Sequence, residues 1–542
     1  MDTLSDLHVY DTTLRDGAQQ EGLNLSVADK LTIARQLDEL GVGFIEGGWP
    51  GANPKDTEFF ARARDELRLQ HACLTAFGAT RRAGVRAADD PLVAALRDSG
   101  ASVVTLVAKS HPRHVELALR TTLEENLEMV RDTVGHLVAE GQRVFLDAEH
   151  FFDGYRADRD YALEVLRTAY SAGAEVVALC DTNGGMLPGW VADVVHAAVQ
   201  TTAGSADTAG RRVGIHCHND TGCAVANTLA AVEAGATHVQ GTINGYGERT
   251  GNADLVSVVA NLELKLDRAV LPDGLLGEAT RIAHAVAEVT NVPPASRQPY
   301  VGASAFAHKA GLHASAIKVD PGLYQHMDPV GVGNDMRLLV SDMAGRASIE
   351  LKGRELGYDL SQERELVDRV TARVKQLEAR GYTFEAADAS FELLLAEEAD
   401  GRRPSYLTVE SWRVITETLA NAAQGEEAVS EATVKVVAEG VRYVETGEGN
   451  GPVNALDQAL RQALVQAFPE VAKFELIDYK VRIVDQGHGT DAITRVLIET
   501  SDGEASWVTV GVGHNVIEAS WEALLDGLTF GLRRLRRGAT PR

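Results

Sequence analysis

Eight short apolar segments alternate with longer amphipathic stretches across residues 1–265, and this alternation constrains the fold more than any other feature. The short segments are rich in β-branched residues and apolar on both faces, as buried parallel strands are. The longer stretches space apolar residues three or four apart, as in residues 26–40 and 122–139. We expect strands at residues 8–11, 43–47, 73–77, 102–107, 143–148, 175–180, 212–217 and 237–242.

This pattern predicts an α/β fold in which residues 1–275 form a (β/α)8 TIM barrel that carries the catalytic site. A doubly wound open sheet is the competing interpretation. The absence of a glycine-rich dinucleotide turn after the first strand favours the barrel.

The remaining chain divides into two further regions. Residues 276–404 are predicted to form a helical linker or lid, with long amphipathic helices within residues 349–381. Acidic residues at 396–401, followed by Arg402, Arg403 and Pro404, indicate a boundary. Residues 405–542 predict an α+β regulatory domain with an antiparallel sheet, built from strands within 405–416, 431–446, 474–484 and 492–500.

Charge and cysteine content exclude several classes of protein. The net charge of −26 argues against a nucleic-acid partner and against an anionic membrane surface. An anionic substrate would therefore be attracted only by a local group of Arg and Lys. The four cysteines include no CxxC pair, so a zinc ribbon or disulfide scaffold is not expected. With no signal-peptide pattern and no membrane-length apolar run, we expect a cytoplasmic protein.

Polar residues follow nearly every predicted barrel strand, at the end where catalytic groups of such barrels lie. A purely structural barrel has no need for them. They are Asp11, Arg15, Asp16 and Gln19 after the first strand, Glu46, Lys109, Asp147 and Glu149 in the middle, and Asp181, Thr182, Asn183, His216, His218, Asn219, Asp220, Asn244, Glu248, Arg249 and Asn252 after the last three.

The segment HCHND (216–220) is the sharpest local signal for a metal. Alternate residues of a strand face the same side, so His216 and His218 converge while Cys217 points away. Two imidazoles with a carboxylate suit a divalent cation, and Asp16 is the candidate third ligand. Asn252 is a candidate fourth through its amide oxygen, which leaves positions open for substrate. Alternatively, His216 and His218 are hydrogen-bonded histidines of the barrel, and Asp16 and Asn252 are turn residues without a ligand.

Arg15 and Thr182 are candidates for substrate contact. Arg15 would place fixed positive charge near an oxygen that becomes negative in a transition state. It also suits a structural ion pair with Glu46 or Glu149, and both roles are compatible. Thr182 would donate a hydrogen bond to a substrate carboxylate, or it is a helix N-cap.

Three motifs, DTTLRDGAQ (11–19), HCHND (216–220) and GERTGN (247–252), resemble those of the barrel metallolyases that include 2-isopropylmalate, homocitrate and citramalate synthases. The resemblance covers essentially the whole chain. EGGWPGANPKD (46–56), TTLEENLEMV (121–130), DAEHFFDGY (147–155) and CDTNGG (180–185) resemble the long-form (R)-citramalate synthases. GNGPVNALDQAL (449–460), GHGTDA (487–492) and VGHNVIEASWEAL (512–524) resemble the allosteric domain of 2-isopropylmalate synthases.

The resemblance implies roles for individual residues. Asp16, His216, His218 and Asn252 would hold Mn²⁺, Mg²⁺ or Zn²⁺, and Arg15, Gln19, Asp147, Glu149 and Thr182 would bind a 2-oxo acid. AFAHKAGLHASAI (305–317) implies a catalytic His313, and LYQHMDPVGVG (323–333) implies Tyr324, both supplied by a neighbouring subunit of a homodimer. With Arg15 and Glu149 these complete the expected catalytic set. One departure is Ser315, where some citramalate synthases carry an acid.

The activity that this resemblance implies is the condensation of acetyl-CoA with pyruvate and water to give (R)-citramalate and CoA, a step toward isoleucine, with isoleucine as the expected effector. Within the enzyme class the alternatives are 2-isopropylmalate or homocitrate synthase activity, and a lyase that cleaves an acyl-CoA. From another class, a metal-binding amino-acid sensor remains open, although intact Asp16, His216 and His218 weigh against it.

Overall fold

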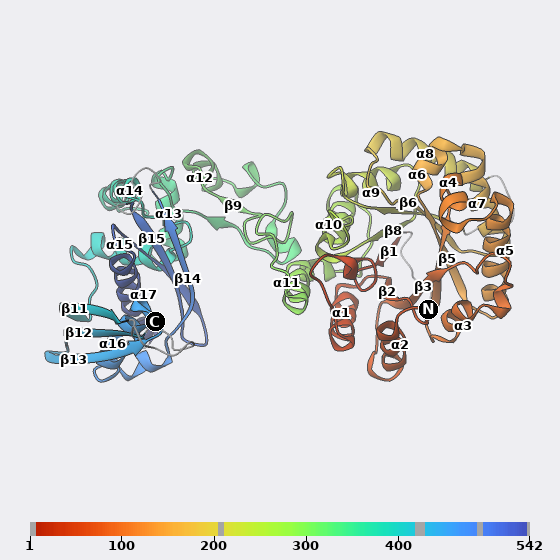
Figure 1. The fold of residues 1–542 in the computed structure, drawn as a ribbon. Coiled ribbons are helices and arrows are strands. Elements are labelled where there is room, and N and C mark those ends of the chain that lie inside the picture. The colour runs from red at the N-terminus through yellow and green to blue at the C-terminus, as the bar shows by residue number, and fades with distance from the viewer. Residues whose placement is uncertain (1–6, 204–210, 418–428, 485–491, 539–542) are drawn as a thin grey trace. The chain divides into compact units, whose positions relative to one another are not determined.

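The computed structural model describes residues 7–203, 211–417, 429–484 and 492–538, and the chain divides into two compact units (Figure 1). The first unit comprises residues 1–306 and 327–335, and the second comprises residues 307–326 and 336–542. Of the GHGTDA segment, only Ala492 lies within the described residues. The domain boundaries expected at 275 and 404 remain predictions.

Eight parallel strands in sequence order close a barrel in the first unit, with β1 paired to β8, so the predicted TIM barrel is confirmed. The observed strand ends differ from the predicted ones by at most two residues. The strands are β1 (His8–Asp11), β2 (Phe44–Gly48), β3 (Cys73–Ala79), β4 (Val103–Lys109), β5 (Arg143–Glu149), β6 (Val176–Asp181), β7 (Arg212–Cys217) and β8 (His238–Gly241).

Helices connect successive strands and surround the barrel (Figure 1). The long ones are α1 (Val27–Leu40), α2 (Pro54–Glu66), α3 (Pro91–Asp98), α5 (Leu123–Ala139), α7 (Arg159–Ala172), α8 (Pro188–Ala203), α9 (Ala224–Glu233), α10 (Leu255–Leu266) and α11 (Ala279–Thr290). Short ones are α4 (Pro112–His114), α6 (Phe151–Ala157), the π-helical η3 (Val115–Leu119), and the 3₁₀ turns η1 (Gly17–Gln19), η2 (Ala87–Asp89), η5 (Ile243–Gly245), η6 (Leu275–Glu278) and η8 (Pro329–Val332).

Helix α1 begins and ends at capping residues. Ser26 and Asp29 form a capping box, in which each side chain bonds the other residue's backbone N–H. Gly41 ends the helix at φ +88, a left-handed conformation that favours glycine. These local signals fix where the helix after β1 begins and where the chain turns back toward β2.

Side chains that alternate along the strands fill the inside of the barrel below its carboxyl end. Five of them form a separate cluster and are fully buried: Tyr10, Phe44, Val103, Phe145 and Val176. The other face of each strand packs on the surrounding helices in the main core. This hydrophobic cluster therefore fills the barrel interior beneath the polar residues at its carboxyl end.

Within its described residues, the second unit contains a parallel pair of short strands and two antiparallel sheets of three strands, whereas a single antiparallel sheet was expected. Its helices are α12 (Gly311–Ile317), α13 (Arg346–Glu355), α14 (Arg364–Ala379), α15 (Asp388–Asp400), α16 (Pro452–Val465) and α17 (Val516–Gly538), with the 3₁₀ turns η7 (Pro321–Leu323) and η9 (Pro469–Lys473). Its strands are β9 (Ala307–His308), β10 (Arg337–Leu338), β11 (Leu407–Glu417), β12 (Val429–Ala438), β13 (Val441–Gly449), β14 (Glu475–Ile483), β15 (Thr494–Ser501) and β16 (Ser506–Gly513).

The prediction of amphipathic helices within 349–381 is confirmed by α13 and α14. One predicted strand segment, 431–446, is instead a hairpin of β12 and β13, because Glu439 and Gly440 both adopt positive φ and reverse the chain. Among the described residues, no helix has the length and hydropathy needed to cross a membrane.

The loop after β8 depends on a glycine that tolerates no side chain. Gly251 has φ +84, and a Cβ there would lie 1.9 Å from the carbonyl oxygen of Gly245. Asn252 of the same loop forms an antiparallel bridge with His218, which follows β7. Gly274 has the same φ of +84, but a Cβ there would meet open space, so this glycine offers a matched control.

We predict that Gly251→Ala destabilises the barrel on the order of 3 kcal/mol, because backbone strain and a clash combine. Gly274→Ala should cost about 1 kcal/mol, since only the unfavourable φ remains. Urea unfolding of the two variants measures the difference. Equal losses would show that the loop relaxes freely around the clash.

Candidate active site

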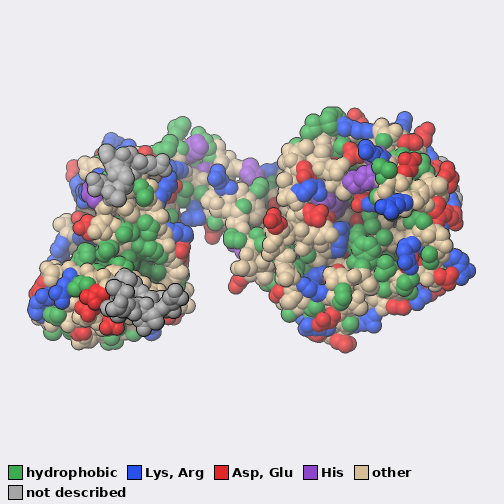
Figure 2. Space-filling model, in the orientation of Figure 1, with side chains coloured by type: hydrophobic (Ala, Val, Ile, Leu, Met, Phe, Trp, Pro, Cys, Tyr) green, Lys and Arg blue, Asp and Glu red, His purple; other side chains and the backbone are tan. Residues whose placement is uncertain are grey.

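A cavity of about 670 Å³ opens at the carboxyl end of the barrel. Figure 2 shows the barrel unit hollowed at its centre, with hydrophobic side chains inside the hollow and charged and histidine side chains around it. The cavity brings together most of the residues singled out from the sequence. Its lining includes Arg15, Asp16, Gln19, Asp147, Glu149, Thr182, His216 and His218.

Three candidate metal ligands converge at one side of this cavity. Asp16 Oδ2 lies 3.1 Å from His216 Nε2 and 3.7 Å from His218 Nε2, and the two Nε2 atoms are 3.4 Å apart. All three residues are buried, and their ligand atoms lie within 4.8 Å of one another. Cys217 points away, as its position in the strand predicts, and meets Thr228 of α9.

Asn252, whose backbone bridges to that of His218, has an unsatisfied side-chain oxygen. Its Nδ2 donates to the carbonyl of Tyr246 at 3.0 Å, which fixes the orientation of the amide. Within the described part of the chain, neither Asn252 Oδ1 nor His218 Nδ1 finds a hydrogen-bond partner, although both are buried. A carboxylate, two imidazoles and an orphaned amide oxygen fit a divalent cation, because a bound cation would satisfy that oxygen.

Asp16 and His218 carry the charge that this role needs, whereas Asp16 outweighs burial and raises the pKa of the third ligand, His216. Burial raises the pKa of Asp16, but the nearby Arg15 and His216 outweigh it and hold this pKa well below the usual range. Burial and then the neighbouring His216 lower the pKa of His218 to about 4. At neutral pH Asp16 is therefore anionic and His218 neutral, which are the forms that bind metal.

Arg15 is held rigidly at the edge of the cavity. Its Nε lies 2.5 Å from Glu46 Oε2, and its guanidinium lies 3.9 Å above the centre of the Phe77 ring. Glu46 is fully buried and also accepts a hydrogen bond of 2.7 Å from Tyr10. The ion pair with Glu46 that was expected as an alternative thus exists, while the guanidinium still lines the cavity.

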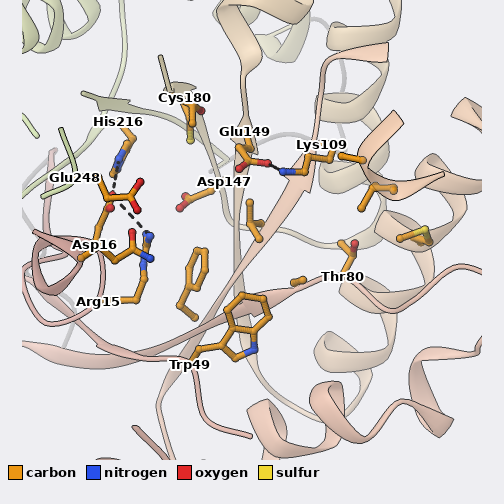
Figure 3. A pocket seen from close by; sticks show the side chains of 18 of the residues that line it. Arg15, Asp16, Trp49, Thr80, Lys109, Asp147, Glu149, Cys180, His216 and Glu248 are labelled. Atoms are coloured by element: carbon orange, nitrogen blue, oxygen red, sulfur yellow. Dashed lines mark hydrogen bonds and ion pairs between the residues drawn. The ribbon is translucent and has the colours of Figure 1, made fainter. Parts of the chain in front are cut away.

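The opposite wall carries Glu149, which is paired with Lys109 (Figure 3). Asp147 lies between this pair and Arg15, and burial followed by the charge of Glu46 raises the pKa of Asp147 to about 6. Thr182 Oγ1 accepts a hydrogen bond of 2.9 Å from His150 N, so its own hydroxyl hydrogen can be donated elsewhere. Thr182 is not a helix N-cap, because α8 begins at Pro188.

Gln240 of β8 was not among the residues expected from the sequence. Its Oε1 lies 2.9 Å from His216 Nδ1, and its Nε2 donates to Asp147 Oδ1 at 2.9 Å. The only sequence signal was position: within the strand THVQGT (237–242), alternation places a polar side chain inside a barrel.

His313 and Tyr324 belong to the second compact unit. His313 lies on α12, and its ring stacks on that of Tyr324 with the centroids 4.1 Å apart. Tyr324 is 40% exposed. The structure thus brings these two candidates to each other within their own unit.

Comparison with known proteins extends along the whole chain. The HMGL-like family model matches residues 6–285, the homocitrate synthase post-HMGL domain-like model matches residues 300–382, and the LeuA allosteric (dimerisation) domain model matches residues 385–532. These three matches follow one another in the order expected from the sequence motifs.

Individual relatives agree with these matches. The chain is 67% identical to an (R)-citramalate synthase of Streptomyces coelicolor, over 98% of both chains, and 49% identical to one of Synechocystis, over 98% of this chain and 97% of that one. It is 32% identical to a 2-isopropylmalate synthase of Pyrococcus furiosus, over 98% of this chain and 99% of that one. The chain therefore belongs to the HMGL-like family, in its (R)-citramalate synthase branch.

Proposed function

We propose that the chain is a divalent-metal-dependent acyltransferase that condenses acetyl-CoA with pyruvate and water, giving (R)-citramalate and CoA. The observation that carries the proposal is the full-length identity of 67% to a protein of that name, in a chain whose barrel holds Asp16, His216 and His218 within ligand distance. A metal-binding sensor without catalysis would not need Arg15 and Glu149 in the same cavity.

Asp16, His216, His218 and Asn252 would hold Mn²⁺, Mg²⁺ or Zn²⁺, in keeping with the orphaned Asn252 oxygen. A divalent cation there supplies Lewis-acid polarisation of a bound carbonyl group. These four side chains would leave part of the coordination of the cation open, so that it could polarise the keto group of a bound 2-oxo acid.

The remaining residues of the cavity orient pyruvate and balance charge. Thr182 donates its free hydroxyl hydrogen to the substrate carboxylate, and Arg15 faces the keto oxygen that becomes an alkoxide. The rigid pair of Arg15 and Glu46 keeps the guanidinium in place, so little reorganisation is needed as charge develops. Gln19, Asp147 and Glu149 complete the walls of the 2-oxo acid site.

Carbon–carbon bond formation needs a base for the acetyl group. We assign His313 to remove a proton from the acetyl methyl of acetyl-CoA, with Tyr324 stacked beside it. The enolate carbon then attacks the keto carbon of pyruvate, whose oxygen becomes the alkoxide and is protonated. Water next attacks the thioester carbonyl, and the C–S bond breaks to release CoA and the new carboxylate.

We further propose that the enzyme is a homodimer in which His313 and Tyr324 serve the barrel of the neighbouring subunit. The match of residues 385–532 to a dimerisation domain supports association. Three apolar side chains close in sequence to His313 and Tyr324 are exposed: Leu312, Val319 and Leu323. Their exposure supports a surface that another chain covers.

The proposed pathway role is isoleucine biosynthesis, with isoleucine as the effector of the C-terminal domain, because citramalate leads toward that amino acid. The cytoplasm is the proposed compartment, in keeping with four cysteines that form no disulfide. The second candidate is 2-isopropylmalate synthase activity, which more distant relatives of that name favour.

A panel of 2-oxo acids tests the function directly. We expect CoA thiol release from acetyl-CoA with pyruvate to exceed that with 2-oxobutyrate, 2-oxoisovalerate or 2-oxoglutarate, and isoleucine to inhibit it. Enzyme treated with a chelator should release no thiol until Mn²⁺ is added back. A preference for 2-oxoisovalerate would establish the second candidate instead.

Replacing Arg15 tests charge stabilisation. Arg15→Ala should lower kcat by about 10²–10³-fold, because one fixed donor to the alkoxide is lost. Arg15→Lys retains a charge opposite buried Glu46 and should be intermediate. Arg62→Ala, which removes an exposed pair with Glu66, is the control and should leave kcat unchanged. Turnover near normal in a folded Arg15→Ala enzyme would refute the assigned role.

Complementation between subunits tests the proposed dimer. Arg15→Ala and His313→Ala each remove one part of the catalytic set and should be nearly inactive alone. Co-expressed heterodimers should recover about half of the normal activity, since one composite site retains both residues. Purified heterodimers without activity would show that each chain uses its own His313.

A further inference from the structure

Gln240 joins a cavity carboxylate to a candidate metal ligand in the centre of the barrel. We propose that Gln240 is a positioning residue. Its hydrogen bond to Asp147 fixes the orientation of its amide, and the amide oxygen then holds His216 so that Nε2 is the atom that faces the metal. The inference deepens the metal site proposed above and rests on it.

The strand register places the three residues together. Gln240 is paired with His216 across the β7–β8 ladder, so both side chains enter the barrel side by side. Asp147 on β5 reaches the same amide from across the interior, and its Oδ1 accepts from Gln240 Nε2 at 2.9 Å. Gln240 is 1% exposed, which excludes bulk water as a competing partner.

The orientation of the amide follows from the chemistry of its neighbours. An ionised carboxylate only accepts hydrogen bonds, so the face of Gln240 toward Asp147 must be its NH₂ group. The second hydrogen of this group faces His238 Nε2, 3.3 Å away. The reversed amide would place its oxygen against the carboxylate oxygen, with no hydrogen between them.

This orientation determines the tautomer of His216. With Nε2 of Gln240 committed to Asp147, its Oε1 faces His216 Nδ1 at 2.9 Å and needs a hydrogen there. A neutral imidazole with hydrogen on Nδ1 has its lone pair on Nε2. That Nε2 is the atom 3.1 Å from Asp16 and 3.4 Å from His218 Nε2.

Without Gln240 the opposite tautomer would compete. Asp16 accepts hydrogen bonds, so in the metal-free site it favours a hydrogen on His216 Nε2, which blocks that atom as a ligand. Groups that orient metal-binding histidines typically contribute 10–100-fold to metal affinity. An amide transmits this orientation without a further buried negative charge beside Asp147, Glu46 and Asp16.

The test combines Mn²⁺ titration calorimetry with nitrogen NMR of ¹⁵N-histidine-labelled, metal-free protein. In the wild type we expect His216 to carry its hydrogen on Nδ1. Gln240→Leu should remove that preference and weaken Mn²⁺ binding by about 10–100-fold. Asn227→Leu, which replaces another fully buried amide outside the cavity, should leave both readouts unchanged.

An exchange of groups provides a rescue. Gln240→Glu alone sets two carboxylates against each other and should weaken Mn²⁺ binding at least about tenfold. Adding Asp147→Asn restores one donor and one acceptor in reversed places, so the double variant should recover most of the lost affinity. Thermal unfolding confirms that each variant is folded.

Two results would overturn the inference. One is a Gln240→Leu protein with wild-type Mn²⁺ affinity and His216 still protonated on Nδ1. The other is a folded double variant that binds no better than Gln240→Glu. If the wild type binds no Mn²⁺ at all, the proposed metal site fails, whereas the His216 tautomer in the two single variants still decides whether Gln240 positions it.

Discussion

The pairing of β1 with β8 is the constraint on which the site depends. Four consecutive residues of each strand are in register, from His8 with His238 to Asp11 with Gly241. Thr12 N then donates to Gly241 O at 2.8 Å, which carries the two chain segments together past the strand ends. In an open sheet with the same strand order, β1 and β8 would lie at opposite edges, and Asp16 would not meet His216 and His218.

A surplus of buried negative charge follows from this closure. Asp16, Glu46 and Asp147 all lie near Arg15, which supplies a single positive charge. The pKa of Asp147, raised to about 6 by burial and then by Glu46, is a consequence of that imbalance. Buried carboxylates without counter-charge are costly, so a divalent cation at Asp16 and the histidines would offset the surplus. The proposed catalytic role and the charge balance of the barrel thus both favour a divalent cation at this position.

Within the second unit, polar contacts fasten the helices to the C-terminal sheets. Tyr382 donates to Glu522 of α17, and Arg403 pairs with the buried Asp526 one turn later. Val510 of β16 shares a hydrophobic core with α14 and α15. Helices α14 and α15 and the C-terminal sheets therefore pack together within the second unit.

Local patterns were strong predictors of secondary structure. Apolar runs and caps located every barrel strand and helix α1, because buried parallel strands and capped helices depend on neighbours in sequence. The order of eight such units also predicted the barrel. The turn at Glu439 and Gly440 and the division into two sheets were missed, since strand length and sheet partners are decided by packing.

The sequence by itself determined which residue types reach the carboxyl rim, because side-chain alternation and barrel topology together place them there. Only the tertiary structure decided how they act on one another. Arg15 forms an ion pair with Glu46, and Thr182 accepts a hydrogen bond from His150 N. Gln240 contacts both Asp147 and His216. These partners are 24 to 93 residues apart in the chain. No local pattern encodes such contacts, because they arise only when distant strands are brought into register and the barrel closes.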